Sequence, residues 1–418
     1  MKHSGKISST PVIALLSNTA WSMFNFRKGL MQALVRQGYK VIVIAPRDKY
    51  AAEIETWGCI FEHVSINRYE GNLADDWRYI RQLYGILKKY GVQFVVSYTI
   101  KPNIYGSILT HVLRIPTITV ITGLGQLFTN PSWKTQLVKP LYKLALRAVH
   151  QIWFLNREDQ AIFQSLQLCT PEKAVYLPSE GVDTGHLTKS YLNGKSPEHF
   201  TFLFAGRLME EKGIREYVAA AEVIHRKFPR VNFDIRGFIE TGYPTAISEA
   251  EILGWQSKGV IRFHGATDDI KEALQNSDCL VLPSYYREGV PKILLEAASM
   301  EKTIITTDNV GCRDIVQHGV NGFLCQSKNA ENLAHWMEQI LLLPYEERRR
   351  MGSCSRELVV RQFEETLIVE RYLATLQQFI PLPATPVESP TPVPWEALTF
   401  ELIDKENSQE SLAYKNPY

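Results

Sequence analysis

Short, continuously apolar runs recur along most of this chain, and a segment long enough for one helix separates each run from the next. In the first half the runs occupy residues 12–16, 41–45, 94–97, 118–121 and 152–155. Because these runs do not alternate with polar residues, both faces of each predicted strand must be covered. A parallel sheet with helices on both faces meets that requirement, so the pattern predicts a doubly wound α/β domain.

The second half of the chain repeats the pattern. Its runs occupy residues 202–205, 231–235, 260–263, 279–282 and 303–306, and helical patterns follow over 330–343, 345–362 and 364–380. A chain of 418 residues with 45% apolar residues is too long for one hydrophobic core, so two domains are expected. A polar stretch at 184–199 separates the halves, and the proline-rich, polar stretch from 381 to 418 predicts a disordered tail.

Two carboxylates, Glu288 and Glu296, lie eight residues apart on a loop and helix that follow an apolar run. Pro291 stands where the start of a helix tolerates proline, and eight helical residues span roughly 10 Å, about the length of a nucleotide diphosphate with a sugar. The amides of Gly289 and Val290 open the helix, where free donors and the helix dipole favour an anion. Alternatively, Glu288 is an ordinary acidic residue of a first turn and Glu296 an exposed helical residue.

A second candidate site is the first turn of the second half, which carries Gly206, Arg207 and Lys212 before a helix. Backbone donors at a helix start together with two cations suit a phosphate group. Alternatively, the two cations pair with Glu210 and Glu211 on a solvated turn.

The stretch Glu288-Gly-Val-Pro-Lys-Ile-Leu-Leu-Glu296, together with this turn, resembles the signature of the family 4 glycosyltransferases. These are retaining enzymes of the GT-B architecture, in which two Rossmann-like doubly wound domains face an interdomain cleft. The resemblance implies that Glu288 lies at the transferred sugar, that Glu296 holds the ribose hydroxyls, and that Arg207 and Lys212 grip the donor diphosphate. It also implies a donor site lined by Gly206, Gly237, Gly289, Val290 and Pro291. Residues 284–287 are expected to touch the sugar.

The resemblance divides the chain into three parts. Residues 1–184 would form the acceptor-side and membrane-side domain, completed by a helix at about 364–380, and residues 185–363 the nucleotide-sugar domain. Residues 381–418 are extra to the family core. The passage between domains would be 177–183, where Glu180 departs from the glycine and serine that the family more often has before Gly-Val-Asp.

Further stretches at 97–106, 122–125, 288–291 and 311–316 resemble a branch of the family that includes a bacterial N-acetylgalactosaminyltransferase. Such enzymes take a UDP-sugar and an acceptor carried on polyprenyl diphosphate at the cytosolic face of the membrane. This implies acceptor contacts from Lys101, Asn103, Gly123 and Gly125. Lys101 either binds the acceptor phosphate or is a solvated charge at a helix start, and Ile100 replaces the histidine of some relatives.

No acidic residue lies between Asp76 and Glu158, whereas eleven lysines and arginines do. Such a segment predicts an anionic partner, either the inner membrane leaflet or a diphosphate. Residues 133–149 combine leucines with lysines, as a helix lying on an anionic leaflet would; alternatively, the leucines only cover the sheet. No nucleic-acid-binding module accompanies the charge, so nucleic acid is not expected as a partner.

Several classes of protein are disfavoured. The first strand-to-helix turn lacks the G-x-G-x-x-G of a dinucleotide site, which weighs against a dehydrogenase. No Asp-x-Asp pair is present, and the adjacent Asp268 and Asp269 are expected to cap a helix, so we expect no metal requirement and no cofactor. Six scattered cysteines and the lack of a long apolar segment predict a reduced, cytoplasmic protein, peripheral at the inner face of the membrane.

The expected reaction is glycosyl transfer with retention. No carboxylate is evidently placed as a nucleophile, so we expect front-face attack in which the leaving phosphate takes the proton of the acceptor. A nucleotide-sugar epimerase of the same architecture is the alternative enzyme. An inactive partner that only binds a ligand in an intact pocket is a further alternative.

Overall fold

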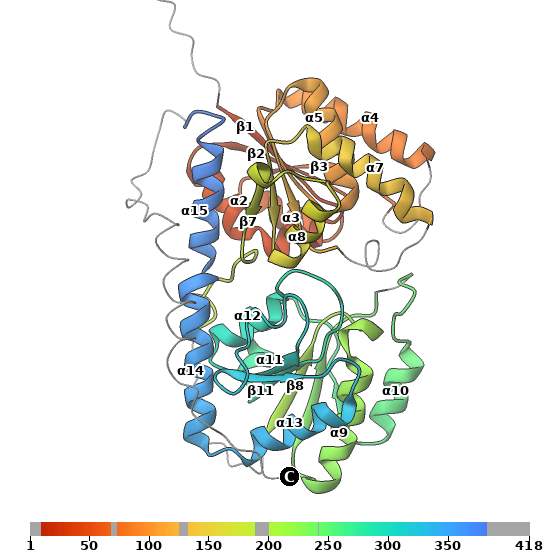
Figure 1. Ribbon diagram of the computed structural model, residues 1–418, viewed down its shortest axis with the longest axis vertical. Helices are drawn as coiled ribbons and strands as arrows, with labels where there is room; N and C mark the ends of the chain where they lie inside the picture. Colours follow the sequence, from red (N-terminus) through yellow and green to blue (C-terminus); the bar gives the residue numbers. More distant parts are fainter. Residues whose placement is uncertain (1–9, 68–72, 125–132, 189–199, 241, 383–418) are drawn as a thin grey trace, which may run out of the picture.

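The computed structural model describes residues 10–67, 73–124, 133–188, 200–240 and 242–382, and for 133–138 the backbone only. Within these residues, two parallel β-sheets are covered by helices and lie one above the other in Figure 1. The predicted α/β class with two Rossmann-like domains is confirmed.

The first sheet has seven strands in the order β3-β2-β1-β4-β5-β6-β7, and all neighbouring strands are parallel. The strands are β1 (Val12–Leu16), β2 (Lys40–Ala45), β3 (Ile60–His63), β4 (Phe94–Tyr98), β5 (Thr117–Ile121), β6 (Gln151–Phe154) and β7 (Ala174–Tyr176). The sequence predicted five of them. It missed the edge strands β3 and β7, which are short and only partly buried and so lack a continuous apolar run.

Alternate residues of the first sheet pack on opposite faces. Ile13 and Leu15 of β1 belong to a cluster with α2, whereas Ala14 and Leu16 belong to a cluster with α4. The helices of this half are α1 (Ala20–Phe26), α2 (Lys28–Arg36), α3 (Ala51–Thr56), α4 (Leu73–Tyr90), the π-helical turn η1 (Pro102–Gly106), α5 (Ser107–Leu113), α7 (Trp133–Arg147) and α8 (Arg157–Ser165). Burial of both faces is the reason that the strands are apolar at every position.

The second sheet has six parallel strands in the order β10-β9-β8-β11-β12-β13. They are β8 (Thr201–Ala205), β9 (Asn232–Arg236), β10 (Ile261–Phe263), β11 (Cys279–Leu282), β12 (Thr303–Thr307) and β13 (Gly322–Cys325). The helices are η4 (Glu210–Lys212), α9 (Ile214–Lys227), α10 (Glu249–Ser257), α11 (Lys271–Gln275), α12 (Lys292–Ser299), α13 (Ala330–Leu342) and α14 (Tyr345–Gln362). One apolar core cluster joins these elements.

The chain crosses between the domains twice, and the two crossings lie side by side. Val182 on the first crossing accepts a hydrogen bond from the amide of Glu365 at 3.0 Å and donates one to the carbonyl oxygen of Phe363 at 2.9 Å. The second crossing leads into α15 (Glu365–Leu376), which runs along the first domain in Figure 1. Its Ile368 and Tyr372 are buried in the core of that domain.

None of the helices within the described ranges has the length and apolar character needed to cross a bilayer.

Candidate active site

A cavity of about 520 Å³ lies between the two domains, where the strands of both sheets end. Asn18 follows β1 and Thr99 follows β4, while Gly206 follows β8 and Gly237 follows β9; all four line the cavity. Strand order reverses between β1 and β4 and again between β8 and β11. Open α/β sheets bind ligands at such reversals, because loops diverge there and leave a crevice.

Twelve of the thirteen predicted site residues line this cavity. They are Lys101, Asn103, Gly123, Gly206, Arg207, Lys212, Gly237, Glu288, Gly289, Val290, Pro291 and Glu296. The thirteenth, Gly125, lies outside the described residues. The fold thus brings the phosphate turn, the two-carboxylate segment and the end of β4 to one place.

The side chains of Lys212 and Glu288 form a largely buried ion pair at the centre of the site. The side chain of Lys212 is 7% exposed and that of Glu288 is 20% exposed. Lys212 comes from the turn before α9, and Gly213 behind it adopts φ 75°, a left-handed conformation that favours glycine. The pair fixes a cation and a carboxylate at one wall of the cavity.

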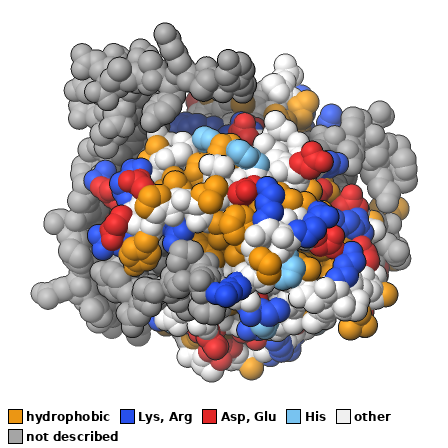
Figure 2. Space-filling model, turned by 90° about the horizontal axis from the view of Figure 1, so that it is seen from below, with side chains coloured by type: hydrophobic (Ala, Val, Ile, Leu, Met, Phe, Trp, Pro, Cys, Tyr) orange, Lys and Arg blue, Asp and Glu red, His pale blue; other side chains and the backbone are white. Residues whose placement is uncertain are grey.

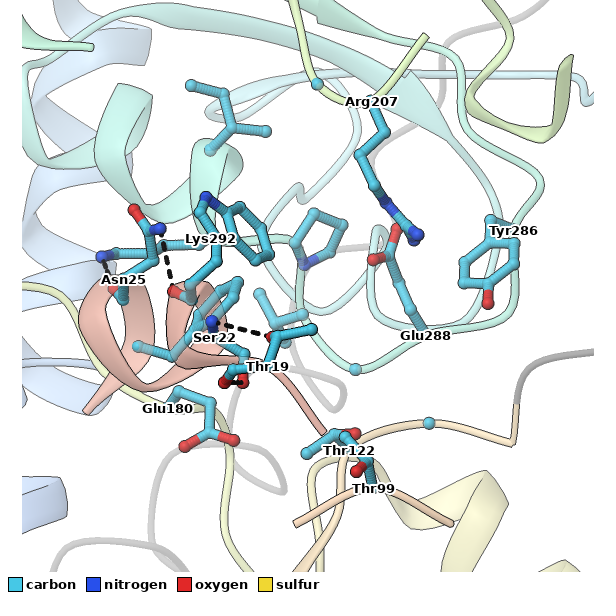
Figure 3. A pocket seen from close by; sticks show the side chains of 18 of the residues that line it. Thr19, Ser22, Asn25, Thr99, Thr122, Glu180, Arg207, Tyr286, Glu288 and Lys292 are labelled. Carbon is cyan, nitrogen blue, oxygen red and sulfur yellow. Dashed lines mark hydrogen bonds between the residues drawn. The ribbon is translucent and has the colours of Figure 1, made fainter. Parts of the chain in front are cut away.

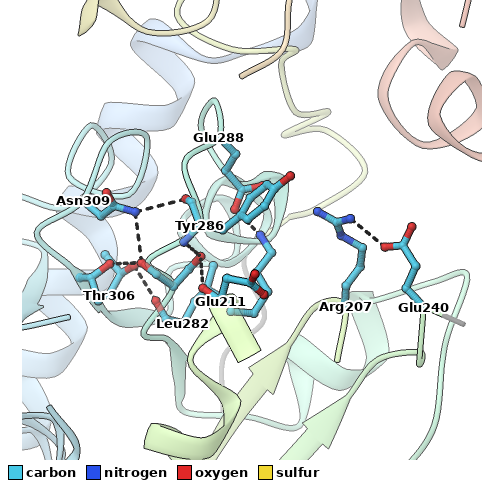
Figure 4. Close-up of polar contacts among 11 residues, drawn as sticks. Arg207, Glu211, Glu240, Leu282, Tyr286, Glu288, Thr306 and Asn309 are labelled. Atoms are coloured by element: carbon cyan, nitrogen blue, oxygen red, sulfur yellow. Dashed lines mark hydrogen bonds and ion pairs between the residues drawn. The ribbon is translucent and has the colours of Figure 1, made fainter. Parts of the chain in front are cut away.

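Arg207 is the second cation of the site. Its Nη1 donates to Glu240 Oε2 at 2.7 Å, and its guanidinium lies 5.4 Å from the centre of the Tyr286 ring (Figure 4). Although burial lowers the pKa of Arg207, the carboxylates of Glu240 and Glu288 outweigh burial and raise that pKa above its ordinary value. Arg207 therefore stays charged beside the cavity.

The alternative pairing of these cations with the acids of their own turn is wrong. Glu210 pairs with Arg215 at 2.8 Å, and the Glu211 carboxylate accepts a hydrogen bond from Thr245. The ion pairs of Arg207 and Lys212 are instead with Glu240 and Glu288, which come from later loops.

Glu296 of α12 is largely buried, with 15% of its side chain exposed, so the alternative of an exposed helical carboxylate is wrong. Burial raises its pKa, and the nearby Lys292 partly offsets this. Lys292 Nζ lies 3.7 Å from Glu296 and also donates to the backbone carbonyl of Asn25 in the first domain (Figure 3). Lys292 thus joins the second carboxylate to the opposite wall of the cavity.

The prediction of a free amide at Gly289 needs correction. This amide donates to the carbonyl oxygen of Thr122 in the first domain at 3.2 Å, because the two loops meet there. Helix α12 begins at Lys292, and Pro291 precedes it as the extended N-cap residue. The Gly289 amide is therefore not available to an anion, while the predicted role of the Val290 amide stays a prediction.

Residues 284–287 are expected to touch the sugar, and the structure places part of this segment at the cavity. Tyr286 and Arg287 line the cavity, whereas Ser284 is fully buried and donates to the carbonyl oxygen of Glu211 at 3.3 Å. Arg287 is held by Asp159 of the first domain, with 3.0 Å between Nε and Oδ1.

Lys101 pairs with Asp76 at 2.7 Å, and Tyr105 donates to the other oxygen of Asp76. The alternative of a solvated charge is therefore wrong, because Lys101 is partly buried and paired, and its contact with the acceptor phosphate stays a prediction. Asn103 is 1% exposed and donates to the carbonyl oxygen of Val120, so it ties η1 to β5 beneath the cavity.

The first-domain wall of the cavity is rich in hydroxyl groups. Thr19, Ser22, Thr99 and Thr122 all lie on this side in Figure 3, together with Asn25. Thr99 has φ 68°, a strained conformation for a β-branched residue, of the kind found at functional sites. Hydroxyl and amide groups in this density suit the recognition of a sugar.

Glu180 forms a buried ion pair with Arg27 at the edge of this wall. Burial raises the pKa of Glu180, and the charge of Arg27 partly offsets the increase. Arg27 occupies the break between α1 and α2, so the pair ties the first interdomain crossing to those helices.

Asp268 and Asp269 do not act together. Asp268 accepts hydrogen bonds from Lys49 Nζ at 2.8 Å and Tyr50 Oη at 2.6 Å, across the cleft, while Asp269 accepts one from the first amide of α11. The prediction of helix capping therefore applies to Asp269 only. No cluster of three or more His, Cys, Asp or Glu side chains suited to a metal ion occurs in the described part of the chain.

Sequence reasoning missed three residues of this site. Glu240 lies in the loop after β9 and bears no motif, and Asp159 lies 128 residues from its partner Arg287. Lys292 follows Pro291 directly, so its closeness to the motif was the one available signal.

Comparison with known proteins matches the two halves to two related descriptions. Residues 192–358 match "Glycosyl transferases group 1", and residues 26–180 match "Glycosyl transferase 4-like domain". The chain is 28% identical to the N,N'-diacetylbacillosaminyl-diphospho-undecaprenol alpha-1,3-N-acetylgalactosaminyltransferase of Campylobacter jejuni, over 88% of this chain and 99% of the relative. It is 27% identical to the UDP-Gal:alpha-D-GlcNAc-diphosphoundecaprenol alpha-1,3-galactosyltransferase of Escherichia coli, over 64% of this chain and 71% of the relative.

The crystal structure of HepE from Anabaena in complex with UDP and glucose shares the fold. It matches with a TM-score of 0.71 at 17% sequence identity, over 87% of this chain and 99% of that chain.

The packing of Gly237 yields a prediction for stability. A Cβ atom at this position would collide with the carbonyl oxygen of Gly206 and lie 2.8 Å from Leu208 Cδ2, so we expect G237A to lower the free energy of unfolding by about 1–3 kcal/mol. Urea denaturation measures this. The control is G254A on α10, where nothing lies within 4 Å of the new atom; it should leave stability unchanged or raise it by up to about 1 kcal/mol.

Proposed function

Because the chain belongs to the group 1 glycosyl transferases and has the GT-B fold, we propose that it transfers a sugar from a UDP-sugar to a polyprenyl-diphosphate-linked saccharide. The sugar is a hexose or N-acetylhexosamine such as N-acetylgalactosamine, and the product enters a surface polysaccharide or glycan. The proposal rests above all on Arg207, Lys212, Glu288 and Glu296 lining one interdomain cavity.

The donor binds against the second domain. Its diphosphate lies at Arg207 and Lys212, where negative charge grows as the bond to the sugar breaks. The buried carboxylate of Glu296 accepts hydrogen bonds from the ribose hydroxyls, and Glu288 orients hydroxyls of the transferred sugar. Each cation is already held by a carboxylate of this chain, so little reorganisation accompanies the reaction.

The reaction proceeds with retention by front-face attack. The bond between the anomeric carbon and the diphosphate oxygen breaks, and the acceptor oxygen bonds to the same face of that carbon. The proton of the acceptor hydroxyl passes to the departing diphosphate. Arg207 and Lys212 balance the charge of that leaving group, so we propose that transfer needs no metal ion and no cofactor.

The acceptor sugar binds against the first domain. Thr19, Ser22 and Thr122 line the first-domain side of the cavity and their hydroxyl groups suit sugar hydroxyls, whereas the hydroxyl group of Thr99 is buried. Both relatives named above carry undecaprenol diphosphate in the names of their acceptors, which supports the same class of acceptor here. None of the relatives named above is an epimerase, so the epimerase alternative gains no support.

We further propose that the chain is cytoplasmic and touches the inner membrane leaflet through α4, α5 and α7. These helices lie together on one flank of the first domain in Figure 1. Among the described side chains, the exposed large apolar ones on these helices are Leu73, Trp77, Tyr84, Val112, Leu141 and Leu144. Lysines and arginines accompany them on α4 and α7, and apolar side chains with cations suit an anionic leaflet.

The position of Trp77 links this flank to the cavity. Its neighbour Asp76 holds Lys101, which lines the cavity, so an acceptor anchored in the leaflet has a short path to the site. The far end of the second domain differs, because acidic and basic side chains are intermixed there (Figure 2). Ion pairs such as Lys227–Glu338 and Lys258–Glu222 neutralise that region.

A transfer assay tests the proposed function. A panel of UDP-sugars is incubated with polyprenyl-diphosphate-linked sugars, with and without a chelator. We expect one combination of donor and acceptor to yield a glycoside with retained anomeric configuration, at the same rate with and without the chelator. We expect E288Q to lower turnover by at least about a hundredfold while UDP still binds. Conversion of the UDP-sugar without acceptor would indicate an epimerase, and binding without turnover an inactive partner.

The raised pKa of Glu296 gives a pH prediction. Because burial raises this pKa, the carboxylate takes up a proton at a higher pH than a free glutamate, and the protonated form is a poorer acceptor for ribose hydroxyls. UDP affinity should therefore fall with acidification, starting above the ordinary range of glutamate. Calorimetry on wild type and E296Q separates this effect from titration of UDP itself. E296Q should bind UDP more weakly than wild type at neutral pH, and the difference in affinity between the two proteins should vanish in acid. A constant difference would contradict the assignment.

Membrane contact predicts a loss of vesicle binding in L73S/W77S. Both side chains are exposed, at 89% and 68%, so folding should be unaffected while sedimentation with phosphatidylglycerol vesicles falls at least about fivefold. The matched control is L253S, an equally simple change at a 64% exposed leucine of the second domain. Equal binding by both variants would exclude this flank.

A further inference from the structure

The backbone of the loop that carries Glu288 is hydrogen-bonded to its own domain at its beginning, and the Glu288 side chain pairs with Lys212 of the same domain. The amides of Tyr285 and Tyr286 donate to the carbonyl oxygen of Glu211 at 2.8 and 3.0 Å. Asn309 Nδ2 donates to the carbonyl oxygen of Tyr286 at 3.1 Å (Figure 4). These bonds stop one residue short of Arg287.

From Arg287 to Gly289 the loop is held by the first domain. Arg287 Nε donates to Asp159 Oδ1 at 3.0 Å, and the Gly289 amide donates to the carbonyl oxygen of Thr122 at 3.2 Å. Between these bonds the two backbones touch, since a Cβ atom on Gly123 would lie 2.9 Å from the Cα atom of Glu288. Glu288 is therefore flanked on both sides by contacts from the opposite domain.

Burial and hydrogen bonds hold the side chain of Asp159 in one position. It is fully buried near the start of α8, its Oδ2 accepts from Asn156 Nδ2 at 2.9 Å, and its amide donates to Asn156 Oδ1 at 2.7 Å. A buried carboxylate is costly unless it is paired, and Arg287 supplies the pairing charge. If Arg287 turned away, the buried carboxylate of Asp159 would lose the cationic side chain that pairs with it.

We propose that Asp159 is a positioning residue for sugar transfer: through Arg287 it fixes Glu288, so that docking of the first domain completes the donor side of the site. The inference deepens the proposed function and rests on it for the chemistry. The contacts that carry it are independent of which sugar is moved.

The proposal predicts that a change at Asp159 lowers turnover and leaves donor binding unchanged. Arg207 and Glu296, which hold the diphosphate and ribose, have no direct contact with Asp159, so UDP affinity should not depend on it. The placement of Glu288 should depend on it strongly, because a misplacement of about 1 Å at a reacting centre lowers rates by about a hundredfold.

The test variant is D159N. The amide nitrogen must face either Asn156 Nδ2 or Arg287 Nε, and both are donors, so one of the two hydrogen bonds is lost in either orientation. The matched control is E158Q, the adjacent residue of α8, whose carboxylate is 48% exposed and lies 3.7 Å from Arg287. It removes the same charge without breaking the buried contact.

We expect D159N to lower kcat ten- to a hundredfold while UDP affinity by calorimetry stays within about twofold, and E158Q to change neither. R287K perturbs the same contact from the other side and leaves Asp159 intact. The kcat of the double variant D159N/R287K should be no lower than that of the slower single variant, because both changes act on the same contact. Hydrogen exchange of a peptide covering 284–292 should quicken in D159N and remain unchanged in E158Q.

Equal kcat and equal exchange in D159N and E158Q would overturn the inference, as would a parallel loss of stability and UDP binding that accounts for the lower rate. Hydrogen exchange needs no turnover. If the wild-type protein transfers no sugar to any acceptor, the proposed function fails, and the exchange comparison still decides whether Asp159 fixes the loop of Glu288.

Discussion

The buried ion pair between Lys212 and Glu288 is the interaction on which the site depends. Removing a charge from water costs several kcal/mol, so each partner is stable in this position only because the other is present. The pair therefore has one geometry before any ligand arrives. Arg207 and Glu240 repeat the arrangement beside it, with Glu240 8% exposed. Charges fixed in this way can stabilise a leaving diphosphate without moving, which is the condition under which electrostatic catalysis is most effective.

The second constraint is that neither domain forms the cavity alone. Lys292 reaches from α12 to the carbonyl of Asn25, and Asp268 accepts from Lys49 across the cleft. Trp21 and Phe238 meet edge to face, with their ring centres 5.9 Å apart. These contacts are few and mostly polar, and interfaces of that kind permit relative motion of domains. The same contacts thus define the site and leave the cleft able to open for substrate and product.

The sequence predicted the elements whose signal is local. Continuous apolar runs marked ten strands, because a strand buried on both faces must be apolar throughout. β13 escaped because Gly322–Cys325 follows a turn-rich stretch and reads as its continuation. The site motifs were also local, so their residues could be named. Their partners could not, since the pairing of Arg207 with Glu240 and of Arg287 with Asp159 depends on how loops meet after folding.

The electrostatics of the basic segment between Asp76 and Glu158 also depend on contacts that the sequence does not reveal. Counting charges along the chain between Asp76 and Glu158 gave an uncompensated positive field, but Asp76 itself pairs with Lys101 and Glu62 pairs with Lys89. A field depends on neighbours in space, and acids from outside the segment return to it in the fold. The net positive charge of this region in the fold is therefore smaller than the count along the sequence suggests. What distinguishes the flank of α4, α5 and α7 is the combination of the remaining cations with exposed apolar side chains, which ordinary solvated helices do not need.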